Sequence, residues 1–144
     1  MKLSVKDRLL VLQVLPDASD ITTMRITRDL AKDLSFSEAE HKALKFKTGE
    51  DWSNGCPKCG ELDTEKLSSK LDDDYGMPMA NCQSCEHKGL MGVNQIGWNR
   101  NADNEKDIEI GDIGKQIIRE QFEKLDQEGK IQASHLDVCE LFGL

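Results

Sequence analysis

Three things are missing from this chain of 144 residues: a long apolar run, an excess of basic residues and a familiar catalytic motif. No stretch approaches the roughly 18 apolar residues that a membrane-spanning helix needs, so we expect no membrane partner. The apolar run near the start is interrupted by Lys6, Asp7 and Arg8, and no small-residue cleavage site follows it. Because a secretory signal peptide is therefore not expected, we place the protein in the cytoplasm.

The missing basic charge restricts the class of partner. Lysine and arginine number 19 against 27 aspartates and glutamates, which gives a formal net charge of −8. A diffuse basic footprint for nucleic acid is absent, and a neutral or basic surface on a partner is the easier match. The chain also has no Walker loop, no dinucleotide fingerprint and no H-E-x-x-H motif, so we expect it not to be an enzyme.

Cysteine is scarce except in residues 54–88, which hold four of the chain's five cysteines. Two C-x-x-C pairs lie there, formed by Cys56 with Cys59 and by Cys82 with Cys85. In a reducing cytoplasm, paired cysteines bind metal more often than they form disulfides. Two thiolates on one turn can chelate one ion, and a second pair completes a tetrahedron. The spacing therefore predicts a zinc ribbon that holds a structural Zn²⁺, since four thiolates fill the coordination shell.

This pattern leaves alternatives open at the same residues. Two disulfides, free thiols or an iron–sulfur cluster are also compatible with four cysteines. His87 follows Cys85 closely and is a spare ligand, although the shell is already complete without it. The fifth cysteine, Cys139, lies between Val138 and Leu141 on the last expected helix, where we expect it to be a buried core residue.

Helical patterns flank the cysteine region on both sides. Caps and apolar periodicity predict helices at residues 4–15, 21–34 and 112–127, with shorter ones beginning near Ser37 and Ser134. Residues 106–110 alternate and predict a short strand, or an extended lead-in to the helix that follows. Neither flank is long enough to bury a good core alone. We therefore predict a mainly α fold with a small β component, in which residues 1–46 plus 101–144 form a helical domain and residues 47–100 an inserted zinc ribbon.

The cysteine region resembles a known group of zinc ribbons. The segments CPKCG (56–60), CQSC (82–85) and WNR (98–100) resemble those of phage and prophage restriction-alleviation proteins. The chain departs from that pattern at Glu86, where the resemblance implies a glycine after the last cysteine. The resemblance covers about a third of the chain and implies a role in countering a host restriction enzyme.

The two ends carry a second resemblance. SVKDRLLVLQVLP, DITTMRITRDL and LSFSEAEHKAL, together with IGWNRNADNEKDIEIGD and KLDQEGKI, resemble a group of small uncharacterised phage proteins. In that group the two halves run on directly, without a cysteine insert. This resemblance implies a phage or prophage origin, and hence the cytoplasm of a bacterial host.

Two functions follow as hypotheses from these patterns. The leading one is a non-enzymatic, zinc-binding phage or prophage accessory protein that binds a host or phage protein and so modulates a host defence or nucleic-acid enzyme. The alternative is a nucleic-acid-binding or transcription-associated zinc ribbon, whose contacts are predicted to be Lys58, Lys66, Lys70, Lys88, Arg100 and Trp98. Residues 51–100 hold eight acidic residues against five basic ones, which disfavours this alternative.

Overall fold

The computed structural model describes all residues, 1–144. It divides into two compact units: the end unit, Met1–Phe36 with Asn104–Leu144, and the cysteine unit, Ser37–Asp103. Each is described separately below. The predicted division placed the third helix, α3 (Glu38–Leu44), with the two ends, whereas the structure groups it with the cysteine unit.

The prediction of a mainly α fold is wrong. Helices account for 41% of the residues and strand for 17%, in three small sheets, so the chain is a mixed α and β protein. Four of the seven strands have only two residues, and each of these pairs with a segment far away in the sequence. Strands of two residues are too short to show an alternating apolar pattern, so the sequence indicates few of them. No helix is both long enough and apolar enough to cross a membrane.

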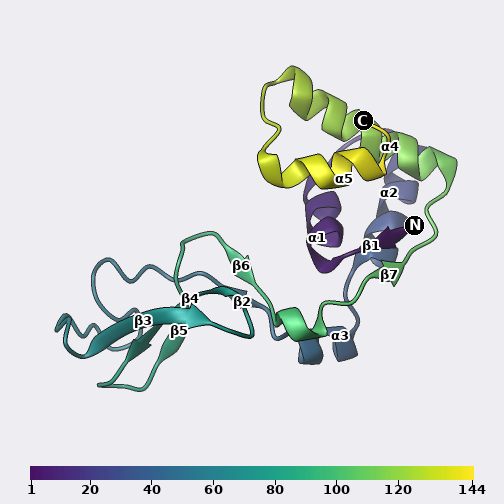
Figure 1. Cartoon of the computed structure of the whole chain (residues 1–144). Helices are drawn as coiled ribbons and strands as arrows, with labels where there is room; N and C mark the ends of the chain where they lie inside the picture. Colours follow the sequence, from purple (N-terminus) through teal and green to yellow (C-terminus); the bar gives the residue numbers. More distant parts are fainter. The chain divides into compact units, whose positions relative to one another are not determined.

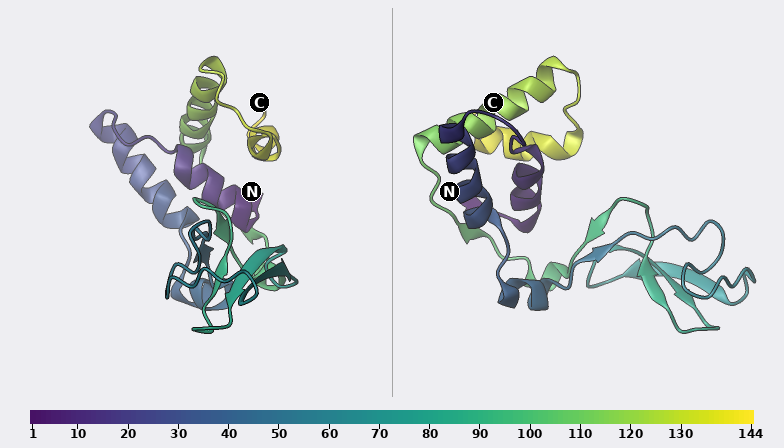
Figure 2. Two further views of the ribbon diagram at one scale, coloured as in Figure 1. Left: turned by 90° about the vertical axis from the view of Figure 1, so that its left-hand side faces the viewer. Right: turned by 180° about the vertical axis from the view of Figure 1, so that it is seen from behind.

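The end unit contains four α-helices, a 3₁₀ turn and a two-stranded sheet (Figure 1). Their bounds are β1 Lys2–Leu3, α1 Val5–Val14, α2 Ile21–Leu34, β7 Lys106–Asp107, α4 Asp112–Gln127, η2 Ala133–His135 and α5 Leu136–Leu141. In Figure 2, α1 and α2 are the purple to blue helices and α4 is green; each of the three packs against the other two. Their shared core includes Val11, Leu34, Ile118, Phe122 and Val138, all fully buried.

Local capping fixes where the first helices begin. Ser4 and Asp7 form the predicted capping box of α1, and the Asp20 carboxylate accepts the backbone N–H of Thr23 at the start of α2. Ser37 and Glu40 form the same kind of box in α3. Each box satisfies N–H groups that the first helical turn leaves unpaired.

The last helix differs from the prediction. It begins at Leu136 rather than Ser134, because residues Ala133–His135 form a 3₁₀ turn. The N–H of Gln132 bonds to His135 Nδ1 at 3.0 Å, which closes this turn.

The two chain ends also meet through a sheet that the sequence did not reveal in full. Strand β1 pairs antiparallel with β7, with Lys2 opposite Asp107 and Leu3 opposite Lys106. The predicted strand at residues 106–110 is therefore shorter than expected. Leu3 is fully buried in the core, and Ile108 and Ile110 are almost fully buried. The β1–β7 pairing therefore contributes apolar side chains to the same core as the helices.

The cysteine unit is built on a three-stranded antiparallel sheet with the order β3-β4-β5 (teal in Figure 1). The bounds are α3 Glu38–Leu44, β2 Lys47–Thr48, β3 Leu67–Asp72, β4 Met77–Cys82, β5 Lys88–Leu90, β6 Ile96–Gly97 and η1 Arg100–Ala102. The hairpin register places Leu67 opposite Cys82 and Asp72 opposite Met77. Tyr75, Met79 and Leu90 form its small apolar cluster, which is too small to hold the hairpin without a further constraint.

Candidate metal centre

Two tight turns present the four cysteines. In the first, the N–H of Gly60 bonds to the carbonyl of Cys56 at 2.8 Å, and Gly60 adopts the left-handed conformation that such a turn requires. The second turn joins β4 to β5 and is closed by the N–H of Cys82, which bonds to the carbonyl of His87 at 2.9 Å. Each turn thus directs its pair of thiols to one point.

The four sulfur atoms form one compact group. Their Sγ atoms all lie within 4.8 Å of one another. The Sγ atoms of Cys56 and Cys85 are 3.6 Å apart, and so are those of Cys59 and Cys82. With Zn–S bonds of about 2.3 Å, a tetrahedral site places its sulfurs about 3.8 Å apart. The observed group therefore has the size that a single tetrahedral ion needs.

The same distances bear on the alternatives that the sequence left open. A disulfide needs sulfurs about 2.05 Å apart, and all five cysteines are free. A polynuclear iron–sulfur cluster holds several iron atoms and sulfides between its thiolates, which requires a wider set of sulfurs than this one. His87 is engaged elsewhere: its Nε2 lies 2.9 Å from Glu50 Oε2, and its ring stacks on Trp52.

The four thiols differ in burial and in acidity. Burial raises the pKa of Cys56, but backbone N–H groups of Cys59 and Lys58 outweigh this effect and lower the pKa to about 6. The N–H of Glu61 lowers the pKa of Cys59, but burial and hydrogen bonds with the other three thiols raise it to about 12. Crowded thiols cannot all ionise, since each new thiolate repels the first. A divalent cation removes that conflict and suits this donor set.

The remaining predicted contacts lie around the sheet. Lys58, Lys66 and Lys70 are exposed on three different segments, and the ammonium of Lys88 pairs with Asp72 at 3.1 Å. Trp98 is only 6% exposed. Its indole N–H donates to Asp103, and the Arg100 guanidinium lies 4.2 Å from its ring centroid. The ring that would stack on a base in the nucleic-acid-binding alternative is thus already covered by Arg100.

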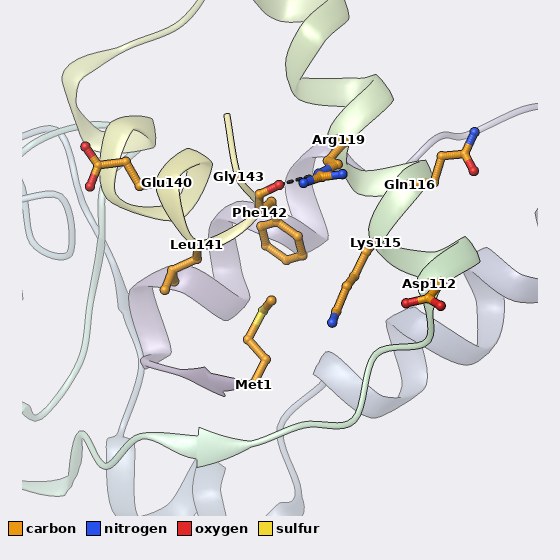
Figure 3. Close-up of a pocket in the computed structure, with 9 residues that line it drawn as sticks. All are labelled: Met1, Asp112, Lys115, Gln116, Arg119, Glu140, Leu141, Phe142 and Gly143. Carbon is orange, nitrogen blue, oxygen red and sulfur yellow. Dashed lines mark hydrogen bonds between the residues drawn. The ribbon is translucent and has the colours of Figure 1, made fainter.

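Two further features belong to the end unit. Cys139 is buried in the core, as predicted, and burial raises the pKa of its thiol. A hollow of about 620 Å³ lies between α4 and the end of α5 with the residues that follow it. Figure 3 shows Met1 and Lys115 directed into this hollow. Arg119 Nε donates to the Phe142 carbonyl at its edge. Sequence reasoning did not indicate this hollow, because its lining comes from both ends of the chain.

Comparisons of the chain with protein-family models, with curated proteins and with solved structures give no match. The functional argument therefore depends on the chemistry of the chain itself. Its strongest element is the group of four cysteines, which lie close enough together to bind one metal ion.

Proposed function

We propose that this protein is a non-enzymatic, zinc-binding accessory protein of a phage or prophage that acts by binding another protein. The observation that carries the proposal is the closed group of four thiols, all within 4.8 Å of one another. Zinc held by four thiolates has no open position for water or substrate, so its role is to stabilise structure rather than to catalyse. Zinc here ties the turn at Cys56 to the turn at Cys85 and gives the cysteine unit the constraint that its small apolar cluster lacks.

The acidic balance of the chain supports a protein partner. A net charge of −8 repels nucleic acid, attracts a basic protein surface and is tolerated by a neutral one. A host enzyme that acts on nucleic acid has such a basic surface, so an acidic protein can occupy it. Inhibition or modulation of a host defence enzyme of this kind is the narrower form of the proposal.

The nucleic-acid-binding alternative has weaker support. Trp98 is buried beneath Arg100, and Lys88 is already paired with Asp72. Base stacking requires an accessible ring, and phosphate binding requires free cations.

Two measurements test the proposal together. Mass spectrometry of the purified native protein should give one zinc per chain. An affinity pull-down from bacterial lysate, with nuclease added and at moderate salt, should then recover one stoichiometric protein. If the partners disappear on nuclease treatment, the nucleic-acid alternative holds instead. If neither zinc nor any protein partner is found, the proposal fails in both of its parts.

A further inference from the structure

A groove of about 270 Å³ lies along α4 and α5 in the end unit. Figure 1 shows the two helices as neighbours, joined by the turn of residues 128–135. The floor of the groove is apolar and is formed by Phe122, Ile131, Leu136, Cys139 and Leu144. It therefore belongs to a different unit from the four clustered cysteines, and it needs an explanation of its own.

The outer part of this floor is unusually open for apolar side chains. Phe122 is fully buried, but Leu136 is 54% exposed and Leu144 is 46% exposed. Leaving apolar surface in water costs about 25 cal/mol for each Å². A single exposed leucine is ordinary, but exposed leucines that line one groove beside a buried aromatic ring indicate a docking site.

The rim of the groove carries charge of one sign. Glu123, Asp126 and Glu140 line it, and the lining contains no lysine, arginine or histidine. None of these three carboxylates forms a salt bridge within the chain. The negative charge of Asp126 acts on the apolar floor of the groove: after the larger effect of burial, it also raises the pKa of the Cys139 thiol.

We propose that this groove binds a basic, amphipathic segment of the partner protein. One apolar side chain of that segment fills the groove, and lysine or arginine residues beside it pair with Glu123, Asp126 and Glu140. Amphipathic helices bind to apolar grooves in this way, and opposite charges at the rim fix their register. The inference rests on the proposed function, since it names the surface and the chemistry through which the protein would bind its partner.

The charges also decide between this occupant and a second copy of the chain. In a symmetric dimer formed through this groove, each acidic rim would face the other. Like charges placed against each other disfavour the contact. A basic partner relieves the same repulsion, which is why we assign the groove to it.

The direct test is a titration of the ¹⁵N-labelled full chain with the synthetic peptide KLLKKLLKKLLK, followed by NMR. Shift changes should concentrate at Glu123, Asp126, Leu136 and Glu140. The peptide ELLEELLEELLE has the same apolar residues and should not bind. Shift changes scattered over the surface, or located in the cysteine unit, would overturn the assignment.

Variants make the test quantitative. Leu136→Arg should weaken peptide binding at least tenfold, because it places a positive charge against the positive peptide and removes an apolar side chain from the floor of the groove. Because Leu136 is exposed, we expect the fold to tolerate this change. Ile113→Arg, on the same helix α4 as Glu123 but outside the groove lining and 62% exposed, is the matched control and should bind as the wild type does. If Leu136→Arg proves unfolded by circular dichroism, Leu144→Arg replaces it. Equal affinity of the folded groove variant and the control contradicts the proposal.

A second variant set tests the rim. The triple change Glu123→Gln, Asp126→Asn and Glu140→Gln should weaken peptide binding by tenfold or more. Removing three exposed acids elsewhere, with Asp17→Asn, Glu105→Gln and Glu109→Gln, should have less than a threefold effect. Equal losses in the two triple variants would mean that only net charge matters, and the groove would not be the site.

Two further outcomes separate this inference from the proposed function. If sedimentation velocity detects a dimer that Leu136→Arg dissociates, the groove binds a second copy and the assignment to a basic partner is wrong. If the pull-down recovers the same protein with wild type and with Leu136→Arg, the proposed function stands but the partner binds elsewhere. If neither recovers a partner, the proposed function fails, and the peptide titration still decides the groove.

Discussion

The thiol of Cys56 lies 3.6 Å from the thiol of Cys85, although the two residues are 29 positions apart in the sequence. The other contact of this length, between Cys59 and Cys82, also joins one turn to the other. An ion bound here therefore crosslinks two separate turns of the cysteine unit. The apolar cluster of this unit is small, so the metal would supply much of the free energy that holds the unit together.

We accordingly expect Cys56→Ser and Cys82→Ser to lose the metal and to disorder the cysteine unit. The end unit has its own core and should retain more than half of the helical signal in circular dichroism. Zinc analysis and NMR spectra of both variants check this expectation. Complete unfolding of either variant would show that the two units depend on one another.

Ser84→Ala is the matched control for these variants. Ser84 lies between Cys82 and Cys85, but its hydroxyl donates only to Glu61, at 2.9 Å. This variant should keep one zinc per chain and the native spectrum. Loss of metal from it would mean that the turn is sensitive to any change, and the cysteine variants would then say nothing specific about ligation.

A second prediction concerns Glu86, which follows Cys85 and has a φ of 61°. That conformation is strained for residues with a side chain but not for glycine. Glu86→Gly should therefore stabilise the zinc-bound cysteine unit by about 1 kcal/mol, visible as a higher concentration of denaturant at its unfolding midpoint. Glu86→Ala keeps the strain and serves as control. An equal gain from alanine would show that the charge, and not the backbone, is responsible.

Arg8 provides a third prediction, in the end unit. Its side chain is 1% exposed, donates to the carbonyls of Leu34 and Ser35, and lies 3.9 Å from the ring centroid of Phe36. These bonds tie α1 to the end of α2, where helix carbonyls have no partner within the helix. Arg8→Met should lower the free energy of unfolding by about 2–3 kcal/mol, because it leaves the buried carbonyl of Leu34 and the partly buried carbonyl of Ser35 without this donor.

Two further variants show whether the arrangement of donors matters at this position. Arg8→Lys should restore only part of the loss, since an ammonium cannot bond to both carbonyls in the geometry of a guanidinium. Arg25→Met removes an exposed arginine from α2 and should change stability by less than about 0.5 kcal/mol. Urea unfolding of the wild type and of the three variants measures these differences. An Arg8→Met protein as stable as Arg25→Met would refute the prediction that the buried Arg8 stabilises the end unit.

The features that the sequence predicted correctly are those encoded locally. The caps at Ser4, Asp20 and Ser37 act within three residues of themselves, and the structure confirms all three. The cysteine spacing likewise predicted which four side chains would gather. A capping residue or a C-x-x-C pair has much the same geometry in any fold, so it can be recognised without knowledge of the rest of the chain.

The features that the sequence did not reveal depend on residues far apart. β1 exists only because Lys2 and Leu3 meet β7, and β2 only because Lys47 and Thr48 meet β6. Two residues are too few to show an alternating pattern, so the β content was underestimated. The burial of Trp98 depends on Arg100, Asp103 and the fold around them, which composition cannot report. The groove of α4 and α5 was missed for the same reason.

The last prediction uses the acidity of Asp20. Hydrogen bonds from the N–H of Thr23, at 2.9 Å, and from its hydroxyl, at 2.7 Å, lower the pKa of this carboxyl in the folded protein. The unfolded chain therefore binds the proton more readily, and the carboxylate stabilises the fold at every pH above its ordinary pKa of about 3.9. This contribution is lost as the pH falls below that value towards the lowered pKa of the folded state.

The difference in melting temperature between wild type and Asp20→Ala should thus be constant from pH 7 to about 5 and should shrink below about 4. Asp20→Asn keeps a capping oxygen that does not titrate in this range, so its stability relative to Asp20→Ala should not change with pH. Release of metal in acid affects all three proteins equally and cancels in these differences. A gap between wild type and Asp20→Ala that persists unchanged to pH 2.5 would show that the charge of Asp20 contributes nothing to the cap.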